Sequence, residues 1–190
     1  MVLILAWSIG SVMDALHAGA FVSGALSGTL PLWTIPSLSF VLAAMIAAAT
    51  GSSWATMAVL FPIVIPLVAA SQGDPNFEPV FLATASAILG GAVFGDHCSP
   101  ISDTTVLSSI ACASDHVDHT RTQAPYALVI GFVTVAVGYV PAGFGVSPWI
   151  SIGLGLAVLW ALLRFLGESP EPTVQTQINT TAKKARTAEA

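Results

Sequence analysis

One short segment of this chain concentrates the side chains that could hold an ion or a proton. Residues 95–105 read GDHCSPISDTT, which places two carboxylates, an imidazole, a thiol and four hydroxyls next to one another. The sequence on both sides is apolar. Ionisable groups at membrane depth are costly, and proteins keep them mainly where ions or protons bind or move. We therefore expect this segment to form a cation or proton site.

The composition places the chain in a membrane. Only 8% of its 190 residues are charged and 55% are hydrophobic, whereas a soluble domain has about 25% charged residues. No Asp, Glu, Lys or Arg occurs between Asp14 and Asp74, or between Arg121 and Arg164. Each of these stretches exceeds the roughly 20 apolar residues that one crossing needs. The net charge of −5 is spread over loops and a tail, so it indicates no nucleic-acid partner.

The elements that must position the polar segment are predicted to be helices, and two of them are predicted to be broken. Residues 1–21 are expected to form one helix, followed by a glycine- and serine-rich connection or broken turn at residues 23–36. Residues 37–70 would measure about 51 Å as a single helix, longer than the roughly 30 Å hydrocarbon core. Thr50 and Gly51 interrupt this run, so we expect two half-length helices meeting at a polar tip, or a discontinuous span.

The second half of the chain follows the same pattern. Residues 71–79 are expected to be a surface loop, and residues 80–94 an apolar helix that the polar segment interrupts. Pro100 and the glycines before it favour an unwound stretch at that point. The remaining predicted elements are a short apolar continuation at 106–113, a polar loop at 114–123, complete spans at 125–146 and 148–166, and a disordered polar tail at 168–190.

These elements predict an all-α integral membrane protein with about five to seven transmembrane or re-entrant helical segments. Residues 1–167 form the transmembrane domain of this prediction, and residues 168–190 form the tail. All five basic residues lie at or beyond Arg121. If the last two spans run up and down, the positive-inside rule places Arg121 and the C-terminal tail in the cytoplasm.

An unwound stretch around Pro100 would expose backbone carbonyls beside oxygen-bearing side chains. Sodium, a hard cation, prefers oxygen ligands, and the broken helices of secondary transporters build ion sites within the membrane in this way. The alternative is that the two carboxylates only cap helix ends in a solvated loop. The side chains that we expect to bind the cation or proton are Asp96, Ser99, Ser102, Asp103 and Thr104.

The neighbouring His97 and Cys98 raise the alternative of a membrane-embedded metalloenzyme. A zinc site usually has four ligands at recognisable spacing, and no CxxC or HExxH pattern is present. We therefore expect no enzyme activity, no cofactor and no metal other than a transported ion, with His97 as a hydrogen-bonding or pH-responsive neighbour of the carboxylates.

Residues 115–119 (DHVDH) resemble a metal-binding tract, but we interpret them as a solvated loop, with pH sensing as the alternative. Asp14 and His17 are expected to be partly exposed.

Residues 50–56 (TGSSWAT) are the second polar interruption. Small hydroxyl side chains can replace water around an ion, and glycine permits close approach of the backbone. A packing surface of small residues between helices is an equally good interpretation of the spacing. Trp54 could be a core residue, an interfacial anchor or a lid. The hydroxyls that would line a cavity at this tip are those of Thr50, Ser52, Ser53 and Thr56.

Both polar segments, together with residues 115–126 (DHVDHTRTQAPY), resemble the C-terminal part of the NhaC family of sodium/proton antiporters. The GDHCSPISDTT pattern is long and chemically unusual, so it carries most of the resemblance, which covers about residues 1–166. The resemblance implies exchange of Na⁺ for H⁺ across the plasma membrane, in a superfamily built from inverted repeats with re-entrant hairpins. It also implies that residues 95–105 hold the cation and that the tip at residues 50–56 faces the same cavity.

The same resemblance leaves the transported pair and the partners open. Some relatives exchange organic anions such as malate and lactate with sodium and protons. Family members are much longer, so this chain corresponds to roughly one of two inverted repeats. We expect a truncated chain or half-transporter, surrounded by lipid, that pairs with a second half-chain or forms a homodimer. An inactive membrane fragment or partner subunit is the alternative.

Overall fold

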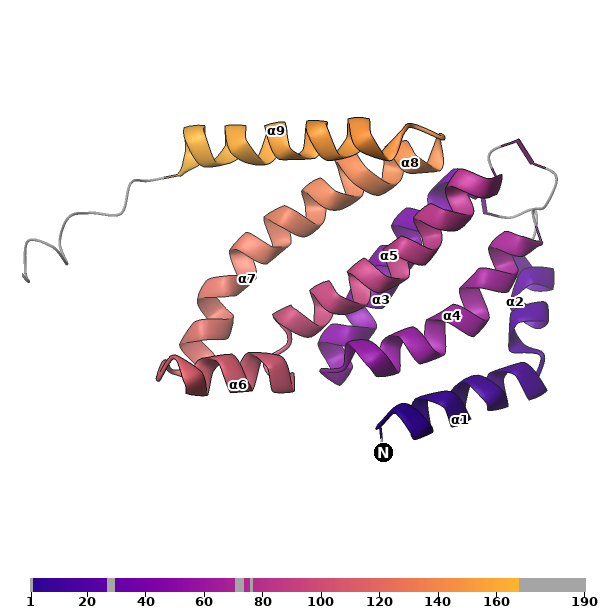
Figure 1. The fold of residues 1–190 in the computed structure, drawn as a ribbon, viewed down its shortest axis with the longest axis horizontal. Coiled ribbons are helices and arrows are strands. Elements are labelled where there is room, and N and C mark those ends of the chain that lie inside the picture. Colours follow the sequence, from indigo (N-terminus) through magenta and orange to yellow (C-terminus); the bar gives the residue numbers. More distant parts are fainter. Residues whose placement is uncertain (1, 27–29, 71–73, 76, 168–190) are drawn as a thin grey trace, which may run out of the picture. The chain divides into compact units, whose positions relative to one another are not determined.

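A computed structural model describes residues 2–26, 30–70, 74–75 and 77–167, and every regular element in these ranges is helical (Figure 1). The chain divides into two compact units, residues 1–159 and 160–190. The tail that was predicted to be disordered lies outside the described residues. The all-α membrane fold is confirmed. Four helical stretches are long and apolar enough to cross a membrane, namely Leu32–Thr50, Phe77–Cys98, His116–Gly143 and Pro148–Phe165.

The N-terminal segment forms two helices, so the prediction of a single helix is wrong. α1 spans Val2–Ala15 and α2 spans Ala18–Leu26. The chain turns between them at His17, whose φ of 50° lies in the left-handed region that residues with a side chain seldom adopt. The predicted connection at residues 23–36 begins later than expected because α2 continues into it; residues 27–29 lie outside the described part.

The long apolar run of residues 37–70 folds as a helical hairpin. A short 3₁₀ helix, η1 (Leu32–Thr34), leads into α3 (Ile35–Thr50), and α4 (Ser53–Ala69) follows after a sharp turn. Gly51 forms the turn with a φ of 66°, a conformation that favours glycine. The predicted break is confirmed. The first helix is not half-length, because η1 and α3 together are long enough to span a membrane, whereas α4, with 17 residues, is shorter than the candidate spans.

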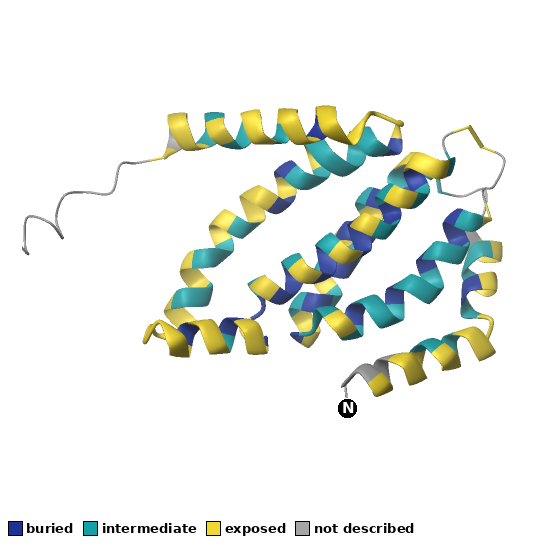
Figure 2. Cartoon of the chain, in the orientation of Figure 1, coloured by how far each residue is buried: buried dark blue, intermediate teal, exposed yellow. Residues whose placement is uncertain are grey.

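The core lies where α3 and α4 pack against α5 (Phe77–Cys98), and Figure 2 shows buried residues along these helices. Gly91 and Gly95 of α5 face α3 so closely that a Cβ on either would clash with a backbone carbonyl oxygen of α3. These glycines were expected to weaken the helix, yet the helix continues through them because small residues allow two membrane helices to approach closely. The buried apolar side chains include Ile35, Ala43, Leu60, Val64, Val68, Val80, Ile88 and Ala92.

The second break separates α5 from α6 (Asp103–Ala111) and consists of residues 99–102. Pro100 was predicted to interrupt the helix here, and that prediction is confirmed. The unwound stretch is shorter than expected, however, because Asp96 and His97 still belong to the last turn of α5. Asp96 therefore sits on a regular helix, directly before the backbone leaves it.

The third long helix begins earlier than expected. Asp115 caps α7 (His116–Val133), and its carboxylate accepts hydrogen bonds from two backbone amides of the first turn, at 2.9 Å and 3.0 Å. The prediction of a polar loop at residues 114–123 is therefore wrong, since most of this stretch is helical. The remaining elements are a π-helical segment η2 (Thr134–Tyr139), α8 (Val140–Gly143) and α9 (Pro148–Leu166).

Many large apolar side chains of these helices face outward. Leu128 and Phe132 of α7 are 69% and 75% exposed, and Leu82 of α5 is 61% exposed. Water-exposed apolar surface of this extent is rare in soluble monomers, whereas lipid or a further membrane helix covers it without penalty. The burial pattern therefore agrees with the composition in placing the helices in a bilayer.

Candidate cation and proton site

Asp96 is a buried carboxylate in the last turn of α5, directly before the second break. It is 7% exposed, and it accepts a hydrogen bond from Ser102 Oγ at 2.8 Å. Ser102 Oγ also lies 2.8 Å from Thr104 Oγ1. An ionised Asp96 can only accept hydrogen bonds, so Ser102 donates its single hydroxyl proton to Asp96. The Thr104 hydroxyl must then donate to Ser102. Three of the predicted residues thus form a hydrogen-bonded chain from the exposed Thr104 to the buried carboxylate.

The other two predicted residues of this segment take different positions. Ser99 is fully buried; its N–H donates to the Asp96 carbonyl at 3.1 Å, and its hydroxyl accepts from the Ile101 N–H at 3.3 Å. Ser99 therefore shapes the turn that follows Asp96. Asp103 is the exposed first residue of α6, where the helix dipole favours a negative charge. Its side chain lies outside the hydrogen-bonded chain.

The hydroxyls of the α3–α4 tip are used mainly by the local backbone. Ser52 caps α4, accepting a hydrogen bond from a backbone amide of its first turn at 3.4 Å. Thr56 is buried and donates to the Ser52 carbonyl at 3.0 Å, while Thr50 donates to a carbonyl one turn earlier in α3 at 2.8 Å. Ser53 is half-buried in the first turn of α4. These bonds give the tip a defined shape.

The two helix breaks lie against each other. Gly51 is buried at the tip, and a Cβ placed there would be 2.9 Å from the carbonyl oxygen of Ile101, which belongs to residues 99–102. The contact is made between backbone segments that are far apart in the sequence. The tip and the unwound stretch after Asp96 therefore form one region of the structure.

We expect Gly51→Ala to destabilise this contact. The left-handed conformation costs an L residue roughly 1–2 kcal/mol, and the added Cβ would press on the Ile101 backbone. Thermal unfolding of the full chain in detergent should show the loss. Gly10→Ala in α1 is the matched control, because nothing lies within 4 Å of its Cβ position. Equal stability of both variants would show that the breaks do not touch.

Two histidines of α7 join this region, and the sequence pattern did not predict their contacts. His116 Nε2 lies 2.6 Å from the Pro100 carbonyl oxygen. Both His116 Nδ1 and His119 Nδ1 contact Ser109 Oγ of α6, at 3.1 Å and 2.7 Å. The spacing of three residues, which places both rings on one helix face, was the available signal. The Pro100 carbonyl, expected to be free for a cation, is occupied by His116.

A polar pocket of about 380 Å³ lies beside these residues. Thr104, the outer end of the chain that leads to Asp96, is part of its wall, as are His97 and His119. The His97 ring contacts the Val93 carbonyl at 3.1 Å, not a carboxylate. In the part of the chain that the structure describes, no three His, Cys, Asp or Glu side chains gather so as to hold a metal ion.

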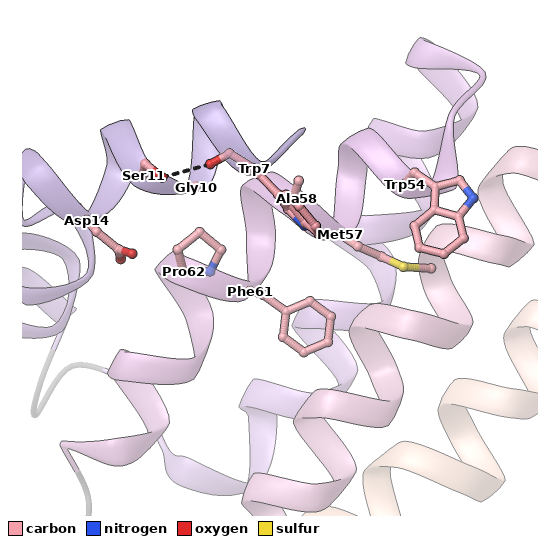
Figure 3. A pocket seen from close by; sticks show the side chains of 9 residues that line it. All are labelled: Trp7, Gly10, Ser11, Asp14, Trp54, Met57, Ala58, Phe61 and Pro62. Carbon is pink, nitrogen blue, oxygen red and sulfur yellow. Dashed lines mark hydrogen bonds between the residues drawn. The ribbon is translucent and has the colours of Figure 1, made fainter. Parts of the chain in front are cut away.

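Figure 3 shows a second pocket, of about 520 Å³, between α1 and α4. Asp14 lines it from α1 and is exposed, while Phe61 and Trp54 line it from α4. Trp54 is 61% exposed, so it is not a core residue. The lining is mostly apolar, and the pocket is built from α1 and α4, not from α5, which holds Asp96.

Broken helices around a buried polar group are the construction that secondary transporters use for ion sites. Comparison with known families agrees with this class. Residues 1–144 match the sequence profile of the Na⁺/H⁺ antiporter family, and the chain belongs to that family.

Three known proteins are similar to this chain over part of their length. An uncharacterized protein of Haemophilus influenzae is 36% identical over 161 residues, which cover 83% of this chain and 30% of that protein. The arginine/ornithine antiporter of Halobacterium salinarum is 38% identical over 99 residues, or 52% of this chain and 19% of that protein. The malate-2H⁺/Na⁺-lactate antiporter of Bacillus subtilis is 31% identical over 134 residues, or 66% and 27%. The chain thus spans less than a third of the length of these relatives. No solved structure gives a significant match.

Proposed function

We propose that this chain forms the cation-binding part of a sodium/proton antiporter of the NhaC type, corresponding to the C-terminal part of longer relatives. The observation that carries the proposal is the environment of Asp96. Its carboxylate is buried, accepts a hydrogen bond from Ser102, and has no ion-pair partner among the described residues. A buried carboxylate with no countercharge beside it is a position at which a protein can hold a cation or a proton.

The oxygens around Asp96 suit sodium in particular. A carboxylate and the hydroxyls of Ser102 and Thr104 are hard ligands of the kind that alkali and alkaline-earth cations take. In the proposed exchange, Na⁺ displaces the proton of Asp96, and the site carries the same charge before and after. Exchange requires that Na⁺ and H⁺ exclude each other from the site, and a single carboxylate that binds either ion meets this requirement. Ser99, beside Asp96, and Asp103, which attracts cations to the surface, complete the proposed set.

The partner proposal follows from the length of the relatives. In transporters built from inverted repeats, the ion site lies between two repeats. We propose that the second repeat is supplied by a further part of the protein, a second half-chain or a second copy. The hydroxyls of Thr50, Ser52, Ser53 and Thr56 would then line the cavity at the tip. We also propose that the protein lies in the plasma membrane, with Arg121 and the C-terminal tail in the cytoplasm, as the positive-inside rule favours.

Everted membrane vesicles from cells without their own Na⁺/H⁺ antiporters test the function. Adding Na⁺ to vesicles that contain the chain should collapse a preformed pH gradient, seen as dequenching of a pH-gradient dye, and choline should not. Co-expression with the N-terminal part of the Haemophilus influenzae relative covers the case in which a second half is required. No Na⁺-dependent dequenching in either preparation would contradict the proposal.

Exchange of organic anions coupled to sodium is the second candidate. The name of the Bacillus subtilis relative, a malate-2H⁺/Na⁺-lactate antiporter, favours it. The pocket beside Thr104 also offers a hydrogen-bond donor to a carboxylate, from the amide of Gln123. Vesicles loaded with labelled lactate and diluted into malate distinguish the two functions. Anion exchange predicts lactate efflux that requires external malate, whereas simple Na⁺/H⁺ exchange predicts none.

A further inference from the structure

The Ser109 hydroxyl is the centre of a hydrogen-bond cluster that the proposed exchange does not use. Ser109 is 1% exposed, and its Oγ lies 2.8 Å from the Thr105 carbonyl oxygen, 3.1 Å from His116 Nδ1 and 2.7 Å from His119 Nδ1. A hydroxyl has one proton to donate and two lone pairs to accept with. The Thr105 carbonyl can only accept, so it must receive the Ser109 proton. Both histidines must then donate to Ser109 from Nδ1.

His116 has a second contact that decides its protonation. Its Nε2 lies 2.6 Å from the Pro100 carbonyl oxygen, which again can only accept, so Nε2 must also carry a proton. A neutral imidazole carries one ring proton and an imidazolium carries two. The cluster has four contacts: Ser109 with Thr105, with His116 and with His119, and His116 with Pro100. All four are therefore hydrogen bonds only when His116 has bound a second proton. Neutral His116 must give up the contact with Pro100, or Ser109 must turn away from Thr105.

We propose that His116, with Ser109 and His119, is a proton-binding site separate from Asp96. The proton on His116 Nδ1 completes a chain of hydrogen bonds from α6 through α7 to Pro100, and so holds α7 against the unwound residues 99–102. The same four residues include Ser102, the partner of Asp96. Loss of the Nδ1 proton as the pH rises leaves Nε2 bonded to Pro100, and Ser109 must then turn its proton away from Thr105 to keep its contact with His116. The link from α6 through His116 to the unwound stretch therefore loses one hydrogen bond.

The electrostatics around His116 are mixed. The N-terminus of α7 disfavours a cation, whereas the carboxylates of Asp115 and Asp118 in the same turn favour it. In the described ranges no carboxylate forms an ion pair with His116, so the hydroxyl and carbonyl oxygens provide its direct contacts. Of the three residues of the cluster, His119 lines the neighbouring pocket. The titratable and charged groups of the adjoining elements are Asp96, His97 and Cys98 on α5, Asp103 and Cys112 on or just after α6, and Asp115, Asp118, His119 and Arg121 on α7.

Nitrogen NMR of the full chain, labelled with ¹⁵N-histidine in detergent micelles, tests the site directly. The ring shifts are recorded between about pH 5 and 9, the range in which histidine charge changes, and His116→Gln assigns the signals. We expect both His116 ring nitrogens to be protonated at acidic pH and Nδ1 to lose its proton as the pH rises. Ser109→Ala removes the acceptor of the Nδ1 proton, so this step should move to lower pH.

Ser108→Ala is the matched control. Ser108 donates to the same Thr105 carbonyl at 3.0 Å but forms no hydrogen bond with either histidine, so Ser108→Ala should leave the step in place. Ser109→Cys, with a similar size and a weaker acceptor, replaces Ser109→Ala if that variant does not fold. A His116 ring that stays singly protonated throughout, or a step that Ser109 substitution does not move, would overturn the proposal.

Only the consequence for transport rests on the function proposed above. If vesicles exchange Na⁺ for H⁺, Ser109→Ala should shift the pH profile of exchange in the direction of the NMR step, and Ser108→Ala should not. An unshifted profile would refute the coupling to residues 99–102. If the unmutated chain exchanges no ions, the antiport proposal fails, while the NMR experiment still decides whether His116 binds the proton.

Discussion

Asp96→Asn should abolish Na⁺-dependent collapse of the pH gradient in everted vesicles, lowering the initial rate by about 100-fold or more, the equivalent of roughly 3 kcal/mol of lost cation binding. The amide has the size of the carboxylate, and its oxygen can still accept the 2.8 Å hydrogen bond from Ser102. It carries no charge and exchanges no proton, so it holds neither ion. The variant therefore removes the charge and the exchangeable proton of the site while changing its packing very little.

Two other acidic residues serve as comparisons for Asp96. Glu78 lies in the first turn at the opposite end of α5 and is exposed, so Glu78→Gln should leave the rate within about twofold. Asp103→Asn should reduce the rate by a smaller factor that shrinks at high ionic strength, since Asp103 is exposed and its field is screened. A wild-type rate for Asp96→Asn at matched expression would remove this carboxylate from the mechanism.

Gly95→Ala should lower the free energy of unfolding by about 3 kcal/mol or more, at the upper end of overpacking costs. A Cβ on Gly95 would overlap the carbonyl oxygen, carbonyl carbon and Cα of Ala44 in α3. These are backbone atoms, so relief requires α3 and α5 to separate, and the core between them then loosens. Because Gly95 directly precedes Asp96, the same shift should displace the carboxylate from Ser102. Thermal unfolding in detergent, followed by size-exclusion fluorescence, measures the loss.

Gly153→Ala in α9 is the control for this prediction, because nothing lies within 4 Å of its Cβ position. An alanine there should be neutral or should stabilise the helix by up to about 1 kcal/mol. If Gly95→Ala unfolds at the same temperature as Gly153→Ala, the close packing of α3 on α5 is contradicted.

The fold could be predicted from the sequence where the signal was local. Gly51 and Pro100 mark the two breaks by their own backbone preferences, and both were found as expected. The turn at His17 carries no glycine or proline, so nothing in the pattern marked it. The run of residues 114–123 was assigned to a loop by its polarity, although Asp115 provides the N-cap of a helix. Polarity alone does not distinguish a loop from an exposed helix start.

The sequence predicted which residues form the candidate site, but not which hydrogen bonds and tertiary contacts join them. The cluster of oxygens at residues 95–105 was visible in the sequence, and the pairing of Asp96 with Ser102 depends on how Pro100 turns the chain. The contact of Gly51 with Ile101 and the approach of His116 to Pro100 are tertiary contacts. They follow from how α3, α5 and α7 pack, which residue types and spacing along one chain do not specify.

The central claim is that Asp96 binds Na⁺ and H⁺ in competition, and proton release by the purified chain tests it most directly. In a weakly buffered detergent solution near the pH of half-protonation of the site, added NaCl should release protons, recorded with a pH indicator, and choline chloride at the same ionic strength should not. Asp96→Asn should abolish the release and Glu78→Gln should preserve it. Equal release from the wild type and Asp96→Asn, or no release specific to Na⁺ from the wild type, would contradict the account.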